Sequence, residues 1–266
     1  MSMLDFAINA TTEYIDHMPK SQRKKYGQFF TSKETAVFMA ELFKVPNKRQ
    51  TLSILDPGAG SGILSIALLE RLQGFTAIEE IRLVCYENDP NVIELLRANL
   101  EVACSQSRQK ISYEIVSDNY ILSQATDYNL MLGANLEPEK FDFVIGNPPY
   151  MKIAKDAPEA LAMPDVCYGA PNLYFLFASM SIFNLRDGGE LVYIIPRSWT
   201  SGAYFKRFRQ KFLSEGVLEH IHLFVSRDKV FEKESVLQET IIIKLRKTRA
   251  KPKTVTITTT QSNADF

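Results

Sequence analysis

The sequence is poor in the residues that mark metal sites, disulfide frameworks and membrane segments. It contains three cysteines, three histidines and one tryptophan among 266 residues. Cys85, Cys104 and Cys167 are odd in number and show no CxxC or metal-ligand spacing, so we expect reduced thiols and no metal site. No apolar run approaches the roughly 20 residues that span a bilayer. The start of the chain lacks the basic end and apolar core of a signal peptide, which indicates a cytoplasmic protein without a membrane partner.

A net charge is also absent, because 31 Lys and Arg residues balance 31 Asp and Glu residues. The charge of the whole chain therefore does not indicate a polyanionic partner, although local clusters still can. Basic clusters occur at Arg23–Lys25, Lys206–Lys211 and Lys244–Lys253, and each is a candidate for phosphate contacts. Clusters of this kind are more often solvated helix faces or tails. The three histidines fall in no recognisable triad or metal-ligand spacing.

Apolar runs alternate with helix-length stretches along most of the chain. The runs TLSILD, IRLVCYE, FDFVIG and GELVYIIP are continuously apolar, as in strands that helices cover on both faces. This order predicts a Rossmann-like α/β fold with a mostly parallel, doubly wound sheet. The run LQETIIIKLRK follows VLEHIHLF without a helix long enough for a parallel crossover, so we expect an antiparallel strand near the C-terminus.

A glycine-rich stretch, LDPGAGSGIL, joins the first predicted strand to a helix and contains Asp56, Pro57, Gly58, Gly60 and Gly62. Glycines at this place let the backbone approach a ligand at the carboxyl ends of the strands. The spacing is G-x-G-x-G and not the G-x-G-x-x-G of dinucleotide binders, which disfavours a nicotinamide cofactor. A tight turn without a ligand is the alternative interpretation.

Acidic residues are predicted at the ends of three successive strands. Glu87, followed by Asn88, ends the second strand, where a carboxylate can accept hydrogen bonds from ribose hydroxyls. Asp118, followed by Asn119, ends the third and could accept from an adenine amino group. ENDP is also a helix N-cap signal, and Asp118 is equally typical of a turn. Together with Asp56 these acids are expected to line one crevice that repels pyrophosphate and suits S-adenosylmethionine, which is cationic and has no phosphate.

The fourth predicted strand runs directly into Asn147, Pro148, Pro149 and Tyr150. Two prolines make this segment stiff and irregular, and a rigid loop that closes a strand is one explanation. NPPY after an S-adenosylmethionine-type loop resembles the amino-group methyltransferases. The resemblance implies that the Asn147 side chain and the Pro148 carbonyl accept hydrogen bonds from the target amine, while Tyr150 stacks on the planar group that bears it.

Two further stretches are similar to the gamma-class N6-adenine DNA methyltransferases of restriction-modification systems. KKYGQFFTSKETAVFM resembles the motif in which a threonine contacts the cofactor carboxylate, a role that the resemblance carries to Thr31. The same TSKE is a capping box, with Thr31 as N-cap and Glu34 at the third position. NLYFLFASMSIF resembles the helix beside the cofactor adenine, with Phe175 or Phe177 as contacts, and is equally typical of an amphipathic core helix.

The stretch DKVFEKESVLQETIII resembles the last motif of the same family, in which an aromatic residue stacks on the flipped target base opposite the NPPY tyrosine. That residue would be Phe231, although a lone loop phenylalanine is as often a hydrophobic anchor. A base inside a duplex has to be flipped out to reach such a pocket. The resemblance thus implies a DNA adenine-N6 methyltransferase that acts on double-stranded DNA with S-adenosylmethionine as cofactor.

The predicted domain organisation has three parts. Residues 1–50 form a helical segment with the FFT cofactor motif, residues 51–247 form the methyltransferase domain, and residues 248–266 form a polar tail. Family members that work alone carry a recognition region after the catalytic domain. We therefore expect either a missing C-terminal recognition domain, which KTVTITTTQ would begin as a strand, or a separate specificity subunit. The first of these is favoured.

Three other functions remain open at this point. NPPY enzymes also methylate glutamine amides, but those typically have a separate helical domain at the N-terminus, whereas here the glycine-rich loop arrives by Gly58. An RNA adenine methyltransferase would use the same flipping and stacking. A catalytically silent scaffold that binds the cofactor within a DNA-binding complex is disfavoured by the intact Asp56, Glu87 and NPPY.

Overall fold

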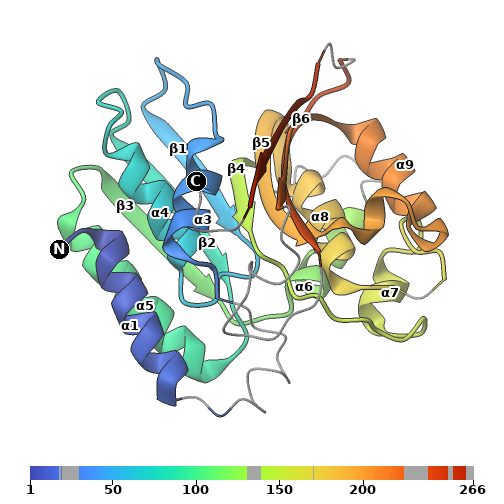
Figure 1. The fold of residues 1–266 in the computed structure, drawn as a ribbon, viewed down its shortest axis with the longest axis horizontal. Helices are drawn as coiled ribbons and strands as arrows, with labels where there is room; N and C mark the ends of the chain where they lie inside the picture. Colours follow the sequence, from blue (N-terminus) through green and yellow to red (C-terminus); the bar gives the residue numbers. More distant parts are fainter. Residues whose placement is uncertain are drawn as a thin grey trace.

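The computed structural model describes residues 1–17, 19, 30–130, 139–169, 171–224, 239–250 and 254–261. These form one eight-stranded sheet with the order β3-β2-β1-β4-β5-β7-β6-β8 (Figure 1). The strands are β1 Thr51–Asp56, β2 Glu80–Tyr86, β3 Lys110–Val116, β4 Phe141–Gly146, β5 Leu185–Pro196, β6 Gly216–Phe224, β7 Thr240–Lys247 and β8 Thr256–Thr260. Helices and 3-10 turns connect them: α1 Met3–His17, α3 Lys33–Glu41, α4 Ile63–Leu72, α5 Pro90–Gln106, α6 Tyr120–Leu130, α7 Pro158–Ala162, α8 Leu173–Asn184, η1 Arg197–Thr200, η2 Ala203–Phe205 and α9 Lys206–Glu215.

The strand directions confirm the predicted fold class. Strands β3, β2, β1, β4 and β5 are parallel. Strand β7 lies between β5 and β6 and is antiparallel to both, as expected from a sequence without a helix long enough for a parallel crossover before it. The predicted polar tail contains β8, which pairs in parallel with β6 at the edge of the sheet.

Helices cover both faces of the sheet, which explains the continuous apolar runs. Ile54 belongs to the core cluster that contains residues of α1, α3, α4 and α5, whereas its neighbour Leu55 belongs to the cluster that contains residues of α6, α8 and α9. Successive side chains of a strand point to opposite faces, so a strand covered on both sides needs apolar residues at consecutive positions. Figure 1 shows α1 and α5 side by side, with α7, α8 and α9 grouped at the other side of the molecule.

Helix α1 belongs to the same core as the helices that follow it. Its residues Met3, Leu4 and Ala7 are buried in the cluster that holds α4 and α5. The amide of Leu4 donates to Oε2 of Glu70 at 3.0 Å, which ties the start of α1 to α4. Among the residues that the structure describes, no helix is long and apolar enough to cross a membrane.

The strand order places two loops at the point where a ligand is expected. From β1 the chain adds β2 and β3 on one side, and it later adds β4 and β5 on the other. The connections after β1 and β4 therefore diverge, and in open α/β sheets the crevice outside the carboxyl ends at such a switch point is the usual binding site. The glycine-rich loop follows β1 and the NPPY motif follows β4.

Candidate active site

The glycine-rich loop has a backbone that requires glycine at two positions. Gly60 and Gly62 have φ angles of 54° and 86°, in the left-handed region where other residues are strained. Gly62 is also the N-cap of α4, and a Cβ built on it would lie 2.7 Å from Cδ1 of Leu96. These glycines let the chain turn sharply from β1 into α4 while α5 packs close to the loop.

The backbone amides of this loop donate hydrogen bonds to other groups of the protein. The amide of Ala59 donates to the carbonyl of Tyr86 at 2.9 Å, and that of Gly62 donates to the carbonyl of Ala59 at 2.8 Å. The amide of Gly60 donates to Oε2 of Glu87 at 3.0 Å. In phosphate-binding loops such amides point at the ligand. The loop therefore does not present these donors to a pyrophosphate, in agreement with the interpretation of its glycine spacing.

Glu87 is bound to the loop and retains one acceptor position. Its Oε1 accepts from the amides of Asn88 and Asp89, both at 2.9 Å, in addition to the bond from Gly60. An ionised carboxylate has about four acceptor positions, so one remains for a hydroxyl of a ligand. Burial raises the pKa of Glu87, and the amide hydrogen bonds oppose that shift. Asn88 is exposed beside it.

Asp56 lies beneath the loop. It is fully buried, and Ser65 donates to its Oδ2 at 2.7 Å, while Oδ1 has no hydrogen-bond partner. Burial raises the pKa of Asp56 to about 7, and the Ser65 hydroxyl opposes the shift. The expectation that Asp56 lines the crevice is therefore wrong, because a side chain without exposed surface can act on a ligand only through its charge and through the loop above it.

The two polar residues after the third strand, Asp118 and Asn119, have different surroundings. Asp118 is exposed. The Oδ1 of Asn119 accepts from the amides of Ile121 and Leu122, both at 3.1 Å, and so caps α6. Its Nδ2 donates to Oε1 of Glu159 in α7 at 2.8 Å. The amide of Asn119 is thus engaged in holding α6 and α7 together, and its role toward the cofactor stays a prediction.

The Asn147 amide is held by two hydroxyl groups. Its Nδ2 donates to Oγ1 of Thr31 at 3.3 Å, and the hydroxyl of Tyr150 donates to its Oδ1 at 2.7 Å. The same Tyr150 hydroxyl lies 3.0 Å from the carbonyl oxygen of Ile194 on β5.

Thr31 reaches the NPPY motif because it does not cap α3. The N-cap is Ser32, whose Oγ accepts from the amide of Thr35 at 3.3 Å, so the predicted capping box is wrong by one residue. Thr31 is buried beside Asn147, and the preceding Phe30 has ring atom Cε1 at 4.0 Å from a Cβ built on Gly60. The segment of residues 30–31 therefore bridges the glycine-rich loop and the NPPY motif.

The structure separates the two aromatic candidates of α8. A Cβ built on Gly58 would lie 3.7 Å from Cε1 of Phe177 and 3.9 Å from Cα of Pro148, so Phe177 faces the loop. Phe175 is 1% exposed and packs in the core against Phe208, with ring centroids 5.4 Å apart. An apolar helix of this composition carries no sequence signal that distinguishes them. The predicted stacking residue Phe231 lies outside the described residues.

A buried tyrosine that the sequence analysis missed supports the NPPY motif from below. A Cβ built on Gly146 would lie 2.7 Å from Cε1 of Tyr193, the residue opposite it on β5. The Tyr193 and Ser181 hydroxyls are 2.6 Å apart, and Ser181 is 3.2 Å from the hydroxyl of Tyr120 at the start of α6. The glycine before NPPY was the available signal, because it leaves room for a large side chain on the next strand.

The donor set fits S-adenosylmethionine better than it fits a phosphate or a metal. Three carboxylates, those of Asp56, Glu87 and Asp118, lie at the ends of neighbouring strands. The backbone amides of the glycine-rich loop donate to groups of the protein itself, and Gly58 leaves room beside Phe177. Within the described ranges, no group of three or more His, Cys, Asp or Glu side chains could hold a metal ion. A cationic ligand with a ribose and an aromatic base matches these features.

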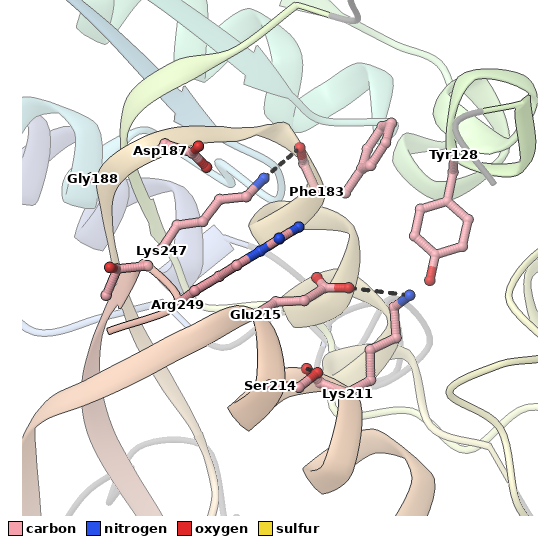
Figure 2. Close-up of a pocket in the computed structure, with 10 residues that line it drawn as sticks. Tyr128, Phe183, Asp187, Gly188, Lys211, Ser214, Glu215, Lys247 and Arg249 are labelled. Carbon is pink, nitrogen blue, oxygen red and sulfur yellow. Dashed lines mark hydrogen bonds and ion pairs between the residues drawn. The ribbon is translucent and has the colours of Figure 1, made fainter. Parts of the chain in front are cut away.

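A cavity of about 910 Å³ lies at the opposite end of the sheet (Figure 2). β5 begins and the antiparallel β7 ends there, so it is far from the carboxyl end of β4. Its lining includes Lys211, Glu215, Lys247 and Arg249. Lys247 donates through Nζ to the carbonyls of Ile182 and Leu185, each at 2.8 Å, and thereby closes the C-terminus of α8. None of the predicted site residues lines this cavity.

Comparison with known proteins agrees with this geometry. A protein from Listeria monocytogenes assigned to the class I S-adenosylmethionine-dependent methyltransferases has the same fold, with a TM-score of 0.66 at 22% identity over 89% of this chain and 67% of that one. The methyltransferase subunit of a type I restriction-modification system from Streptococcus thermophilus gives a TM-score of 0.63 at 19% identity over 84% of this chain and 45% of that one. Both confirm the predicted fold.

Sequence comparison identifies the family. Type II methyltransferase M.BsuBI from Bacillus subtilis is 36% identical over 228 residues, which are 85% of this chain and 44% of that protein. The chain thus spans less than half the length of this relative. The model of the Eco57I restriction-modification methylase family matches residues 72–231, a range that begins at the last residue of α4 and includes Glu87 and NPPY. The chain belongs to the Eco57I restriction-modification methylase family.

Proposed function

We propose that this chain catalyses methyl transfer from S-adenosylmethionine to N6 of adenine in double-stranded DNA. The observation that carries the proposal is the Asn147 amide, which Thr31 and Tyr150 hold at the carboxyl end of β4, directly beside the glycine-rich loop. Family membership and the name of the Bacillus relative support a DNA-modifying methyltransferase. The choice of adenine rests on the resemblance of the NPPY and outer motifs to the N6-adenine enzymes.

The loop and its neighbours would hold the cofactor, which supplies a methyl group on a positively charged sulfur. Glu87 has one acceptor position for a ribose hydroxyl, and Phe177 offers a ring beside Gly58 for the adenine. The buried carboxyl of Asp56 stabilises a positive charge above the loop when it is ionised. Thr31 would contact the cofactor carboxylate through its hydroxyl, as the family resemblance implies.

At the target, the Asn147 side-chain oxygen and the carbonyl of Pro148 would accept the two N–H bonds of the adenine amine, as the family resemblance implies. These acceptors turn the nitrogen lone pair toward the methyl carbon. The new nitrogen–carbon bond forms as the carbon–sulfur bond breaks, its electron pair stays on sulfur, and the proton leaves to solvent afterwards. Oriented carbonyl dipoles stabilise the charge that develops on nitrogen.

Tyr150 would position the base and would not act as a base catalyst. Burial raises its pKa well above the usual value for tyrosine, so its hydroxyl stays protonated near neutral pH. The ring would stack on the flipped adenine, and Phe231 is proposed for the opposite face. Both roles follow from the family resemblance and remain proposals.

Replacement of Asn147 by alanine tests the proposal. We expect methyl transfer to unmethylated genomic DNA, followed with radiolabelled S-adenosylmethionine, to fall at least about 100-fold, because an oriented acceptor at the reacting atom is lost. Calorimetric affinity for S-adenosylmethionine should change little. Asn129→Ala, at an exposed position of α6, is the matched control and should keep full activity. An active Asn147→Ala protein, or label transferred to RNA or glutamine amides in place of DNA, would contradict the proposal.

Sequence recognition is proposed to lie outside this chain. The chain matches 44% of the Bacillus relative, and its fold is shared with the methyltransferase subunit of a type I system. A C-terminal recognition domain or a separate specificity subunit would both fit these facts. The chain alone should then methylate DNA with little sequence preference, which sequencing of the methylated positions would measure.

A further inference from the structure

Two tyrosines are exposed on segments that follow the ends of β4 and β5. Tyr168, in the segment after NPPY, is 54% exposed, and Tyr204, in η2 just before α9, is 61% exposed. A pair of large aromatic side chains that is exposed to solvent often marks a binding surface. Neither residue was singled out by the sequence motifs.

Direct contacts join the two segments into one surface. A Cβ built on Gly169 would lie 2.2 Å from Cδ1 of Tyr204, and Gly169 has a φ of 87°, so the Tyr204 ring rests on this glycine. Arg207 donates through NH1 to the carbonyls of Pro164 and Cys167, at 3.3 and 3.1 Å. Its guanidinium lies 5.8 Å from the centre of the Tyr168 ring. We call Tyr168, Gly169, Tyr204, Lys206 and Arg207 the tyrosine surface.

The tyrosine surface is close to the proposed target-base position. The ring of Tyr150 is 6.3 Å from that of Tyr174, which is in turn 6.0 Å from that of Phe205. Phe205 lies between Tyr204 and Lys206 in the chain, so the surface is two ring contacts away from the catalytic tyrosine. A DNA strand carries one phosphate per ~3.4 Å of helix axis, so phosphates that flank a flipped nucleotide are within its reach.

The charges around the tyrosine surface favour a polyanion. Lys206 and Arg207 are both exposed. The nearby carboxylate of Asp165 is paired with Lys211 at 2.6 Å. Stacking rings beside cations are typical of nucleic-acid surfaces, whereas the cores of protein interfaces are depleted in lysine.

We propose that the tyrosine surface binds the DNA strand next to the flipped adenine, with Lys206 and Arg207 on phosphates and the rings of Tyr168 and Tyr204 against sugars or unstacked bases. This inference rests on the proposed function and adds the face of the protein along which the substrate lies. It assigns a substrate contact to residues outside the NPPY motif and the glycine-rich loop.

Fluorescence anisotropy with the 266-residue chain tests the inference. The probe is a labelled duplex with one mismatched adenine, which flips at lower cost than a paired one. The double variant Tyr168→Ala/Tyr204→Ala should bind at least about 30-fold more weakly, because two stacking rings are lost. Tyr204→Phe keeps the ring and should bind as the wild type does.

The salt dependence of DNA binding distinguishes the loss of a phosphate contact from other causes of weaker binding. Lys206→Gln should lower the slope of log affinity against log salt by about 0.9, the value for one phosphate contact. The matched control is Arg249→Gln, because Arg249 is also an exposed cation but lines the cavity at the other end of the sheet. Its slope should equal that of the wild type. Calorimetric binding of S-adenosylmethionine should be unchanged in all variants, which also shows that they are folded.

The outcomes distinguish this inference from the proposed function. If the wild type methylates DNA but the tyrosine and lysine variants bind the probe with wild-type affinity and slope, the inference is overturned and the function stands. If the wild type transfers label to RNA and not to DNA, or does not bind the duplex, both are overturned. A change of oligomeric state without a change in DNA affinity would assign the surface to a protein partner and overturn the inference.

Discussion

The two ends of the sheet carry similar kinds of residues and use them differently. At the amino end of β5, the half-buried Lys247 donates to carbonyls at the end of α8, and Lys211 pairs with Glu215 (Figure 2) and also with Asp165. At the carboxyl ends of β1 and β2, Asp56 is buried beneath the glycine-rich loop, and Glu87 keeps an acceptor position beside it. A large cavity lined by charged residues is therefore weak evidence for a site when the fold itself uses those charges. Hydrogen-bonding capacity that the fold leaves unused is the stronger signal.

Gly146→Ala, at the carboxyl end of β4, is expected to reduce methyl transfer more than the other variants below. The new methyl would lie 2.7 Å from the Tyr193 ring, so either the ring or the end of β4 has to move, and Asn147 moves with it. We expect methyl transfer to fall by about 100-fold, since small displacements of positioning groups cost this much. The unfolding free energy should fall by about 1 to 3 kcal/mol.

A second glycine variant and a measurement of cofactor affinity serve as controls for Gly146→Ala. Gly74→Ala changes an exposed glycine where the nearest atom would be 3.4 Å away, and its activity should match that of the wild type. Cofactor affinity, measured by calorimetry, should change less than transfer does in Gly146→Ala. A Gly146→Ala enzyme with normal turnover would show that Tyr193 does not position the NPPY motif.

At the amino end, Lys247→Met should reduce stability and leave the site intact. The ammonium of Lys247 bonds with three carbonyls near the end of α8, and their loss costs about 2 kcal/mol. Chemical denaturation measures this change, and calorimetry should give an unaltered affinity for S-adenosylmethionine. Lys247→Arg, which can still donate to these carbonyls, should be less destabilised. An equal loss in both variants would rule out helix closure as the role of this lysine.

The smallest expected effect is the pH dependence of cofactor binding through Asp56. Burial raises the pKa of this carboxyl from 3.8 to about 7, so part of it is protonated at neutral pH. A cationic ligand favours the ionised form, and its affinity should therefore rise with pH by up to about 10-fold between pH 6 and pH 8. Calorimetry at several pH values measures this, and the profile of Asp56→Asn should be flat over the same range.

The raised pKa of Asp56 affects folding stability in the opposite direction. Because the folded state holds the Asp56 proton more tightly than the unfolded state, this residue's contribution to stability falls as pH rises from 3.8 to about 7. Identical affinity profiles for the wild type and Asp56→Asn would show that the buried carboxyl does not take part in cofactor binding.

Local patterns were enough for the fold and for bringing the glycine-rich loop and NPPY to one end of the sheet. Continuous apolar runs predicted strands with two covered faces, and the lack of a crossover helix before residue 240 predicted the antiparallel pair of β6 and β7. The glycine-rich loop and NPPY both lie at the switch point of the strand order, as their places after the first and fourth strands indicated. Such signals are strong because each depends on neighbouring residues alone.

Individual side chains were harder to place. The capping box was assigned to Thr31 although Ser32 caps α3, because the two hydroxyls differ only in where the backbone turns. Asp56 was expected to line the ligand crevice, but it is buried and bonds with Ser65 of α4. Tyr193 was not noticed, since an apolar strand gives no indication that a tyrosine hydroxyl will meet Ser181 on a separate helix.

The sequence by itself determined the α/β class, the parallel order with its antiparallel strand, and the residues from which a methyltransferase site can be built. Only the tertiary structure decided that Thr31 and Tyr150 orient Asn147, that Phe177 and not Phe175 faces the loop, and that Tyr168 and Tyr204 share one surface. The reason is physical. Periodicity and turn chemistry act over a few residues, whereas the burial and the hydrogen-bond partners of a side chain depend on segments that are far away in the chain.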